Sequence, residues 1–272
     1  MKKKRTVQRV VKKILTAIAI IMLVVGLGFL LFPPISNFIG KMIANSEADR
    51  FDSMIENIID DGSSFQDAHN DGRVDDDGYI ISEDGEKSDT PVLFKVDIDR
   101  LYKDSVAYNE RLKEHQPEML SEETYVNPSL DLYSYGVQDY IYGYVTADSI
   151  DMRLPIYLGA NDSTMSYGAA HMSATSLPIG GDSTNTVLAG HTGYIGRIFF
   201  DNLRYLNIGD EVKIKNYWTE LKYKVVRTEI HAPNESQDVF IEEGKDKLTM
   251  ITCISDGNGG FDRYYVICER EK

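Results

Sequence analysis

One cysteine, one histidine and one arginine lie at the ends of predicted β-strands, where their side chains could act together. Cys253 ends an apolar run, Arg263 opens the next one, and His191 follows a third run inside a Gly-His-Thr-Gly turn. A thiolate can attack a carbonyl carbon, an imidazole can carry protons, and a guanidinium can stabilise the negative charge of the intermediate. These residue types therefore predict acyl transfer by a cysteine nucleophile.

The same residues also permit a structural interpretation. A cysteine that ends an apolar strand is commonly part of a packed core, and a histidine in a glycine-rich turn is commonly a surface residue. The sequence has no Walker loop, dinucleotide glycine fingerprint, His-Glu-x-x-His helix or Gly-x-Ser-x-Gly elbow. A β-domain that binds partners without catalysis, with Cys253 in its core, is the alternative to the enzyme.

Short apolar runs rich in Val, Ile, Tyr and Thr alternate with Gly, Asn and Asp turns in the second half of the chain. This texture predicts a closed or sandwich β structure, with a short helical segment at 199–206. The predicted strands are Tyr140–Val145, Leu154–Leu158, Thr186–Ala189, Glu211–Lys215, Leu221–Val226, Leu248–Cys253 and Tyr264–Cys268.

Charge divides the chain into two parts. The whole sequence has 43 acidic and 29 basic side chains, a net charge of −14, which argues against a general nucleic-acid binder.

Residues 1–13 are nevertheless strongly basic, and residues 14–32 carry no charge. An uncharged helix of that length covers about 28 Å, which is enough to cross a bilayer. A signal peptide would have a shorter apolar region. We therefore expect a retained anchor, with the basic end in the cytoplasm and everything after Pro34 outside the cell.

The segment that follows the anchor has two textures. Apolar residues recur at helical spacing over 36–59 and again over 92–114, whereas 60–89 is rich in Asp, Gly, Ser and Glu. We expect helices on either side of a flexible acidic loop. Asp75, Asp77 and Asp84 could occupy three positions of a calcium loop, but Arg73 would then stand at its first ligand position. The solvated loop is the preferred interpretation, and the sequence predicts no metal site and no cofactor.

Several motifs resemble the sortase family, and class C, the pilus-assembling type, in particular. Thr249-Met250-Ile251-Thr252-Cys253 is similar to the TLxTC strand of sortases, with Met in place of Leu. Gly190-His191 and Arg263 resemble the sortase histidine and arginine. The similarity covers about 105–270 and includes Tyr108-Asn109, Leu154-Pro155-Ile156-Tyr157, the run from His171 to Gly181, Asn207-Ile208-Gly209-Asp210 and Cys268-Glu269-Arg270.

The resemblance implies a mainly β fold, an eight-stranded sortase barrel with short helices, after a transmembrane helix and a helical extension. The implied organisation is a cytoplasmic tail at 1–13, an anchor at 14–32, an extension at 33–104 and a catalytic domain at 105–272. It implies a single-pass membrane enzyme whose catalytic domain is extracellular.

The resemblance also implies transpeptidation. Cys253 would attack the Thr–Gly bond of an LPxTG-like sorting signal and form a thioester, which an amine would then release. His191 would act as general acid and base, Arg263 would hydrogen-bond the oxyanion or the substrate backbone, and Thr252 would contact the substrate. A pilin lysine would be the acceptor in class C, whereas a peptidoglycan amine would serve a sortase that anchors single proteins.

One departure from the class C pattern concerns the lid. Class C sortases often carry a lid with an Asp-Pro-aromatic motif, but residues 121–132 offer only Asn127-Pro128-Ser129. We expect Cys268 to be free and buried rather than paired with Cys253, and His171 to be structural. We expect His69, His115 and His231 to be surface residues.

Overall fold

The computed structural model describes residues 2–271 apart from 60–62, 64, 95, 122, 195 and 234–236. They form two compact units, one of residues 2–42 with 196–197 and one of 43–194 with 198–271. The first unit consists mainly of the N-terminal part of helix α1 (Lys2–Glu56), which continues through Pro33 and Pro34. Its apolar side chains between Ile14 and Phe32 are exposed, and the helix is long and apolar enough to be a candidate membrane span.

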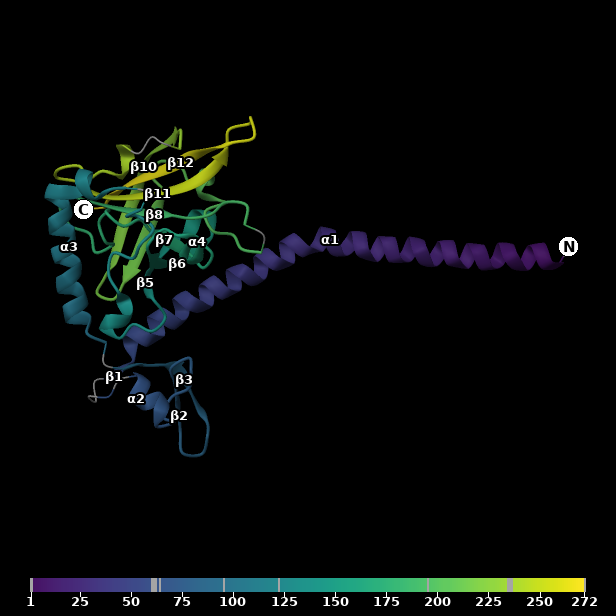
Figure 1. The fold of residues 1–272 in the computed structure, drawn as a ribbon, viewed down its shortest axis with the longest axis horizontal. Coiled ribbons are helices and arrows are strands. Elements are labelled where there is room, and N and C mark those ends of the chain that lie inside the picture. Colours follow the sequence, from purple (N-terminus) through teal and green to yellow (C-terminus); the bar gives the residue numbers. More distant parts are fainter. Residues whose placement is uncertain are drawn as a thin grey trace. The chain divides into compact units, whose positions relative to one another are not determined.

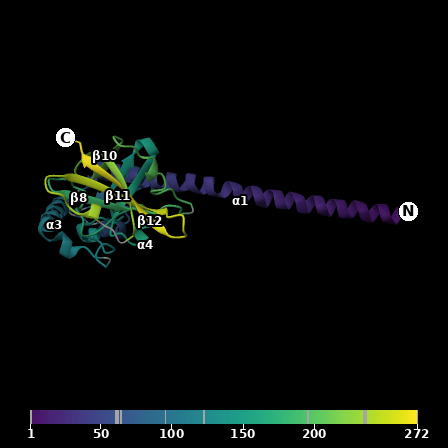
Figure 2. The same cartoon turned by 90° about the horizontal axis from the view of Figure 1, so that it is seen from above.

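The second unit is built on a closed barrel of eight strands, which confirms the mainly β fold. The order around the barrel is β10-β12-β11-β8-β7-β6-β5-β9, and Figures 1 and 2 show β10, β11, β12 and β8 side by side. The strands are β5 (Ile141–Ala147), β6 (Met152–Leu158), β7 (Ala169–His171), β8 (Thr184–Ala189), β9 (Glu211–Asn216), β10 (Glu220–His231), β11 (Asp246–Ser255) and β12 (Phe261–Arg270). Seven of these overlap the predicted runs, and β7 is the strand that the sequence did not predict.

Two neighbouring barrel strands run in the same direction, and this matters for the site. β8 and β11 are parallel, whereas β11 and β12 are antiparallel. The C-terminal ends of β8 and β11 therefore meet the N-terminal end of β12 at one edge of the barrel. His191, Cys253 and Arg263 come from these three ends.

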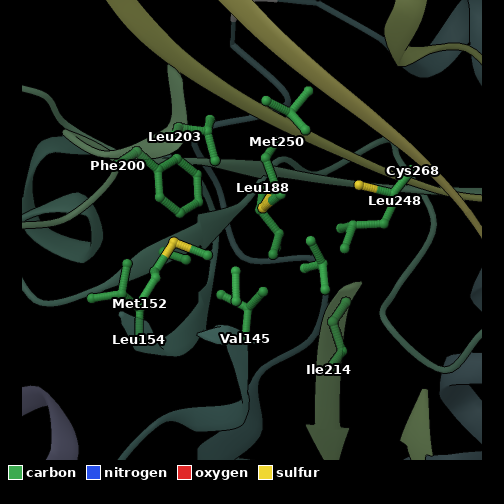
Figure 3. Close-up of a cluster of buried hydrophobic side chains, with 14 of the residues drawn as sticks. Val145, Met152, Leu154, Leu188, Phe200, Leu203, Ile214, Leu248, Met250 and Cys268 are labelled. Atoms are coloured by element: carbon green, nitrogen blue, oxygen red, sulfur yellow. The ribbon is translucent and has the colours of Figure 1, made fainter. Parts of the chain in front are cut away.

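Alternating apolar side chains fill the barrel interior. Leu188 from β8, Leu248 and Met250 from β11, and Cys268 from β12 belong to one buried cluster, with Val145, Leu154 and Ile214 from other strands. Figure 3 shows these side chains converging from opposite sides of the barrel. Because side chains alternate along a strand, the residues between them face outward.

The helix α3 (Ile98–Met119) covers part of the outside of the barrel. Asp97 caps its N-terminus by accepting a hydrogen bond from the Arg100 amide at 3.0 Å. Asn109 on its buried face donates to the Leu177 carbonyl and accepts from the Leu177 amide. Gln116, two turns further along the same buried face, donates to the Ala174 and Val239 carbonyls and accepts from the Ile241 amide. α3 thus fixes two segments, at 174–177 and 239–241, against the barrel.

The segment between α1 and α3 is folded where the structure describes it, which contradicts the expectation of a flexible acidic loop. Ala68, Val74 and Val92 are buried together in a small core of their own. The Asp75 carboxylate, a ligand in the calcium alternative, accepts hydrogen bonds from the Asp77 and Tyr79 amides and from Lys87 Nζ. The elements are β1 (Ile58–Ile59), α2 (Phe65–Asn70), β2 (Tyr79–Ile81), β3 (Lys87–Pro91) and β4 (Leu93–Phe94).

The predicted amphipathic helix over 36–59 is the second half of α1, which is unbroken to Glu56. Within the second unit, Phe51 packs against the rings of Tyr144 and Tyr217, with centroids 6.0 and 4.9 Å away. Arg153 of β6 forms ion pairs with Asp49 and Asp52 of the helix. Asp49 and Asp52 therefore form an ion-pairing face on this one continuous helix.

Candidate active site

Strand register brings the three predicted site residues together. Cys253 and Arg263 are direct partners in the antiparallel ladder of β11 and β12. Ala189 is the partner of Ile251 in the parallel ladder of β8 and β11, and the Gly190 amide continues that ladder by donating to the Ile251 carbonyl at 3.1 Å. The Gly190–Ile251 bond therefore places His191, one residue beyond Gly190, at the same edge of the barrel as Cys253, two residues beyond Ile251. We call these three residues the His–Cys–Arg row.

The outer face of the barrel presents this row. Ile251 and Tyr265 pack with Val187 and Val239 in a cluster separate from the barrel interior. Cys253 lies two residues beyond Ile251, and Arg263 lies two residues before Tyr265, so both belong to the same face. Both side chains are half-buried, and Cys253 is a free thiol. A half-buried thiol beside an arginine is open to a substrate that lies across this face.

The loop that carries His191 is fixed by backbone and ring contacts. The Asp201 carboxylate accepts from the Gly193 amide at 2.7 Å and from the Phe199 amide at 3.1 Å, and the His191 carbonyl accepts from the Phe200 amide. A Cβ at Gly190 would lie 2.7 Å from the Phe200 ring, so only glycine fits before the histidine. Asp201 is a positioning residue for which no signal is visible in the sequence.

An exposed tyrosine stacks on the imidazole. The ring centroids of His191 and Tyr194 lie 5.6 Å apart at an interplanar angle of 15°, and Tyr194 also meets Phe199 in a T-shaped contact. Tyr194 is 43% exposed. The stack limits the rotation of the imidazole and leaves its edge for proton transfer.

Thr252, the predicted substrate contact, has its hydroxyl directed to the His191 loop. The residue is 6% exposed, and its hydroxyl donates to the Gly190 carbonyl at 2.8 Å. Since that donation uses its one proton, the Thr192 hydroxyl is the donor in the 2.5 Å contact between the two threonines. Thr252 thus bonds to the residues on both sides of His191. Its contact with a substrate stays a prediction.

Cys268 lies far from the row and inside the barrel. Its partner in the ladder is Leu248, five residues before Cys253 on β11. Five residues of strand span about 17 Å, which is beyond the reach of a disulfide. Both cysteines are free, and burial raises the pKa of the Cys268 thiol well above its usual range. The expectation of a free, buried Cys268 is confirmed.

His171 is fully buried and neutral. Its Nε2–H donates to the Ser176 carbonyl at 3.0 Å, and its Nδ1 lies 3.3 Å from the Ser129 hydroxyl. Burial lowers the pKa of His171 from 6.5 to about 4, although the bonds to Ser176 and Thr175 oppose that change. This arrangement agrees with a structural role.

The segment that stands where class C sortases carry a lid is bonded to the barrel. The Tyr125 carbonyl accepts from the Ala160 and Ser173 amides. The Ser173 hydroxyl donates to the Asn127 carbonyl and lies 2.8 Å from the Ser129 hydroxyl. Asn127, Pro128 and Ser129 are therefore held beside the turn that follows β6 rather than projecting as a free loop.

His231, which the sequence suggested was a surface residue, is half-buried in an ion-pair cluster around Asp238. Its Nε2 lies 2.8 Å from an Asp238 carboxylate oxygen, and Arg227 pairs with the other oxygen. The pairing of β10 with β12 that creates this cluster has no signal in the sequence. In the part of the chain that the structure describes, no group of three His, Cys, Asp or Glu side chains is placed to hold a metal ion.

Comparisons with known proteins agree with the geometry. A family model described as a sortase domain matches residues 145–271. Sortase A of Bacillus anthracis is 26% identical over 115 residues, which cover 42% of this chain and 53% of that protein. The chain therefore spans about half the length of this curated relative.

Solved structures extend the likeness to about 65% of the chain. The complex of Streptococcus agalactiae sortase C1 with MTSET is 26% identical with a TM-score of 0.56, and the match covers 65% of this chain and 91% of that one. Sortase C-1 from Streptococcus pneumoniae is 29% identical with a TM-score of 0.57, and covers 65% and 90%. Sortase C from Clostridium perfringens is 28% identical with a TM-score of 0.52, and covers 64% and 89%.

Proposed function

The chain belongs to the sortase family and has the fold of its class C members, and from that premise we propose that it is a membrane-anchored cysteine transpeptidase. Its substrates are surface proteins with an LPxTG-like sorting signal, and its acceptor is a lysine amine of a pilin. The observation that carries the proposal is the His–Cys–Arg row, in which register pairs Cys253 with Arg263 and the Gly190–Ile251 bond brings His191 to the same edge.

The first half of the reaction forms a thioester. The Cys253 thiolate attacks the carbonyl carbon of the signal's threonine, and Arg263 donates hydrogen bonds to the oxygen that becomes negative. The carbon–nitrogen bond to glycine then breaks, and the His191 imidazolium gives its proton to the leaving amine. The threonine carbonyl is left bonded to Cys253 sulfur.

The second half reverses these roles. A neutral acceptor amine attacks the thioester carbonyl, and the His191 imidazole takes the proton that the amine loses. Arg263 again stabilises the tetrahedral oxyanion. When the carbon–sulfur bond breaks, the thiolate is restored and a new amide joins substrate to acceptor.

One observation favours a pilin acceptor, and another supports the location at the membrane. Similar structures include a sortase C1 of a Group B Streptococcus pilus island and a pilus-related sortase C of that organism. The long apolar helix of residues 2–42 is a candidate anchor that would keep the enzyme at the membrane surface. With the basic end of the helix in the cytoplasm, the catalytic unit is extracellular.

The test uses the full chain in detergent with a fluorescent LPxTG peptide and two acceptors, a lysine-bearing pilin domain and a peptidoglycan stem peptide. We expect cleavage, a covalent adduct of Cys253 with the threonine end, and joining to the pilin lysine. Cys253→Ala should abolish all three while the protein stays folded, and Cys268→Ala is the matched control that keeps them. Joining to the stem peptide alone would replace the pilin proposal with single-protein anchoring. Full activity of Cys253→Ala would reject the cysteine mechanism.

A further inference from the structure

A second histidine lies in line with the His–Cys–Arg row. His231 is the direct partner of Arg263 in the ladder of β10 and β12, just as Cys253 is its partner in the ladder of β11 and β12. Partner residues on neighbouring strands have their side chains on one face, about 5 Å apart. Along this edge of the barrel, from β8 across β11 and β12 to β10, the order of these residues is therefore His191, Cys253, Arg263 and His231.

Ring geometry places the His231 side chain on that same outer face. Its imidazole meets the Tyr265 ring in a T-shaped contact, with centroids 5.0 Å apart and an interplanar angle of 78°. Tyr265 belongs to the outer cluster of Ile251 and Val187. His231 and Arg263 are therefore register partners whose side chains lie on the same outer face of the barrel.

A buried carboxylate fixes the imidazole. Asp238, in the short helix η4 (Gln237–Val239), is 8% exposed. One of its oxygens lies 2.8 Å from His231 Nε2, and the other pairs with Arg227. Burial by itself would raise the pKa of the Asp238 carboxyl, but the bonds from Arg227 and His231 outweigh burial and lower it. Asp238 is thus an anion that can hold His231 in one orientation.

The backbone of Asp238 is equally fixed, so the carboxylate is not a mobile partner. Its carbonyl accepts from Asn185 Nδ2 at 2.9 Å and from the Thr249 hydroxyl at 3.2 Å. These residues lie on β8 and β11, the two strands that lead to His191 and Cys253. One residue of η4 therefore ties together β8, β10 and β11, at positions four residues before Cys253 and six residues before His191.

We propose that His231, held by Asp238, is a positioning residue of this site that aligns Arg263 and adds positive charge beside the Cys253 thiolate when it is protonated. The proposal rests on the proposed function for its meaning in catalysis, but its effect on the thiol exists without any substrate. The charged and titratable groups that face His231 are Arg263 and Tyr265 on β12, Asp238 on η4, and Arg227 and Glu229 on its own strand.

The expected effect follows from charge and distance. Strands are spaced by about 4.8 Å, so His231 lies two strands, roughly 10 Å, from Cys253. A positive charge at that distance favours a thiolate by an amount worth about 0.3–1 pH unit at a half-exposed site. The effect appears only on the acidic side, where His231 is protonated, and disappears when it is neutral.

The test measures the alkylation rate of Cys253 by iodoacetamide against pH, in the full chain with the labelled peptide identified by mass spectrometry. His231→Gln removes the charge and keeps an amide donor for Asp238, so folding is preserved. We expect the acidic limb of its rate profile to shift to higher pH by about 0.3–1 unit, and the limb above about pH 7 to superimpose on that of the wild type. We also expect a threefold to tenfold lower kcat for peptide cleavage below pH 6.5, with KM unchanged.

Arg227→Gln is the matched control because it removes the other partner of Asp238, four residues away from the row. If the cluster served only to hold η4, both variants would behave alike. A profile of His231→Gln that superimposes on wild type, or an equal shift in Arg227→Gln, would overturn the proposal. A shifted alkylation profile in a protein that cleaves no peptide would leave it standing and reject the proposed function instead.

Discussion

The reactive edge of the barrel and its interior contain the same two residue types in opposite environments. Cys253 and His191 are half-buried at the ends of strands, whereas Cys268 and His171 are 0% exposed. In the interior, burial raises the pKa of the Cys268 thiol and lowers that of His171 to about 4, so both stay neutral. Arg263 pairs with Cys253 in the ladder, whereas the ladder partner of Cys268 is Leu248.

Place in the barrel, rather than residue type, distinguishes the thiol and imidazole at the strand ends from the buried, neutral pair in the interior. A charged thiolate or imidazolium needs water or an opposite charge, and the apolar cluster around Cys268 offers neither. The strand ends lie at the surface, where water is available, and β12 brings the positive Arg263 beside the Cys253 thiol.

The largest expected effect is on thiol reactivity. In the folded protein, a neutral alkylating reagent should modify Cys253 at least about a thousandfold faster than Cys268, because Cys268 reacts only after the barrel opens and opening costs several kcal/mol. Mass spectrometry of the two cysteine-containing peptides over time measures the ratio. In denaturant the two rates should converge, which provides the control. Comparable labelling of both thiols in the folded state would contradict the comparison.

A second prediction concerns the buried histidine. The pKa of His171 is about 4 in the folded protein and 6.5 in the reference state, so the unfolded chain binds more protons between these values. Stability is therefore fully present above pH 6.5 and falls as the pH drops toward 4, by about 3 kcal/mol in total. Chemical denaturation at several pH values measures this slope.

The variant that isolates this contribution is His171→Gln, whose amide can still donate to Ser176 but does not titrate. We expect it to cost about 1–2 kcal/mol at pH 7 and to flatten the fall between pH 6.5 and 4. His115→Gln is the control, since the side chain of His115 is 53% exposed. An unchanged slope in His171→Gln would show that His171 is not the group responsible.

Much of the barrel could be predicted from the sequence, because strands of four or more residues carry a visible apolar pattern. β7 could not, because Ala169–His171 is too short to show alternation. The folded insertion was missed for a different reason. Its core of Ala68, Val74 and Val92 is small, and acidic side chains dominate the composition around it.

The site divides in the same way. The types of His191, Cys253 and Arg263, and their positions at strand ends, were visible in the sequence. The contributions of Asp201, Asp238 and His231 were not, because each depends on a contact between segments whose pairing only the fold defines. Local pattern predicts elements, whereas positioning residues follow from register.

The smallest expected effect concerns Thr252, which connects the buried side of β11 to the reactive edge. Its hydroxyl donates to the Gly190 carbonyl and accepts from Thr192, so it fixes the backbone on both sides of His191. Thr252→Val keeps the shape but removes both bonds, and we expect about a tenfold loss in kcat for peptide cleavage with little change in KM. Thr252→Ser should restore most of the rate because it restores the hydroxyl. Thr192→Val, which removes only the second bond, should lose less of the kcat.

If Thr252 instead acts mainly by touching the substrate, KM will rise, kcat will stay unchanged, and Thr192→Val will match the wild type. Steady-state kinetics of the three variants decides between holding the histidine and binding the substrate.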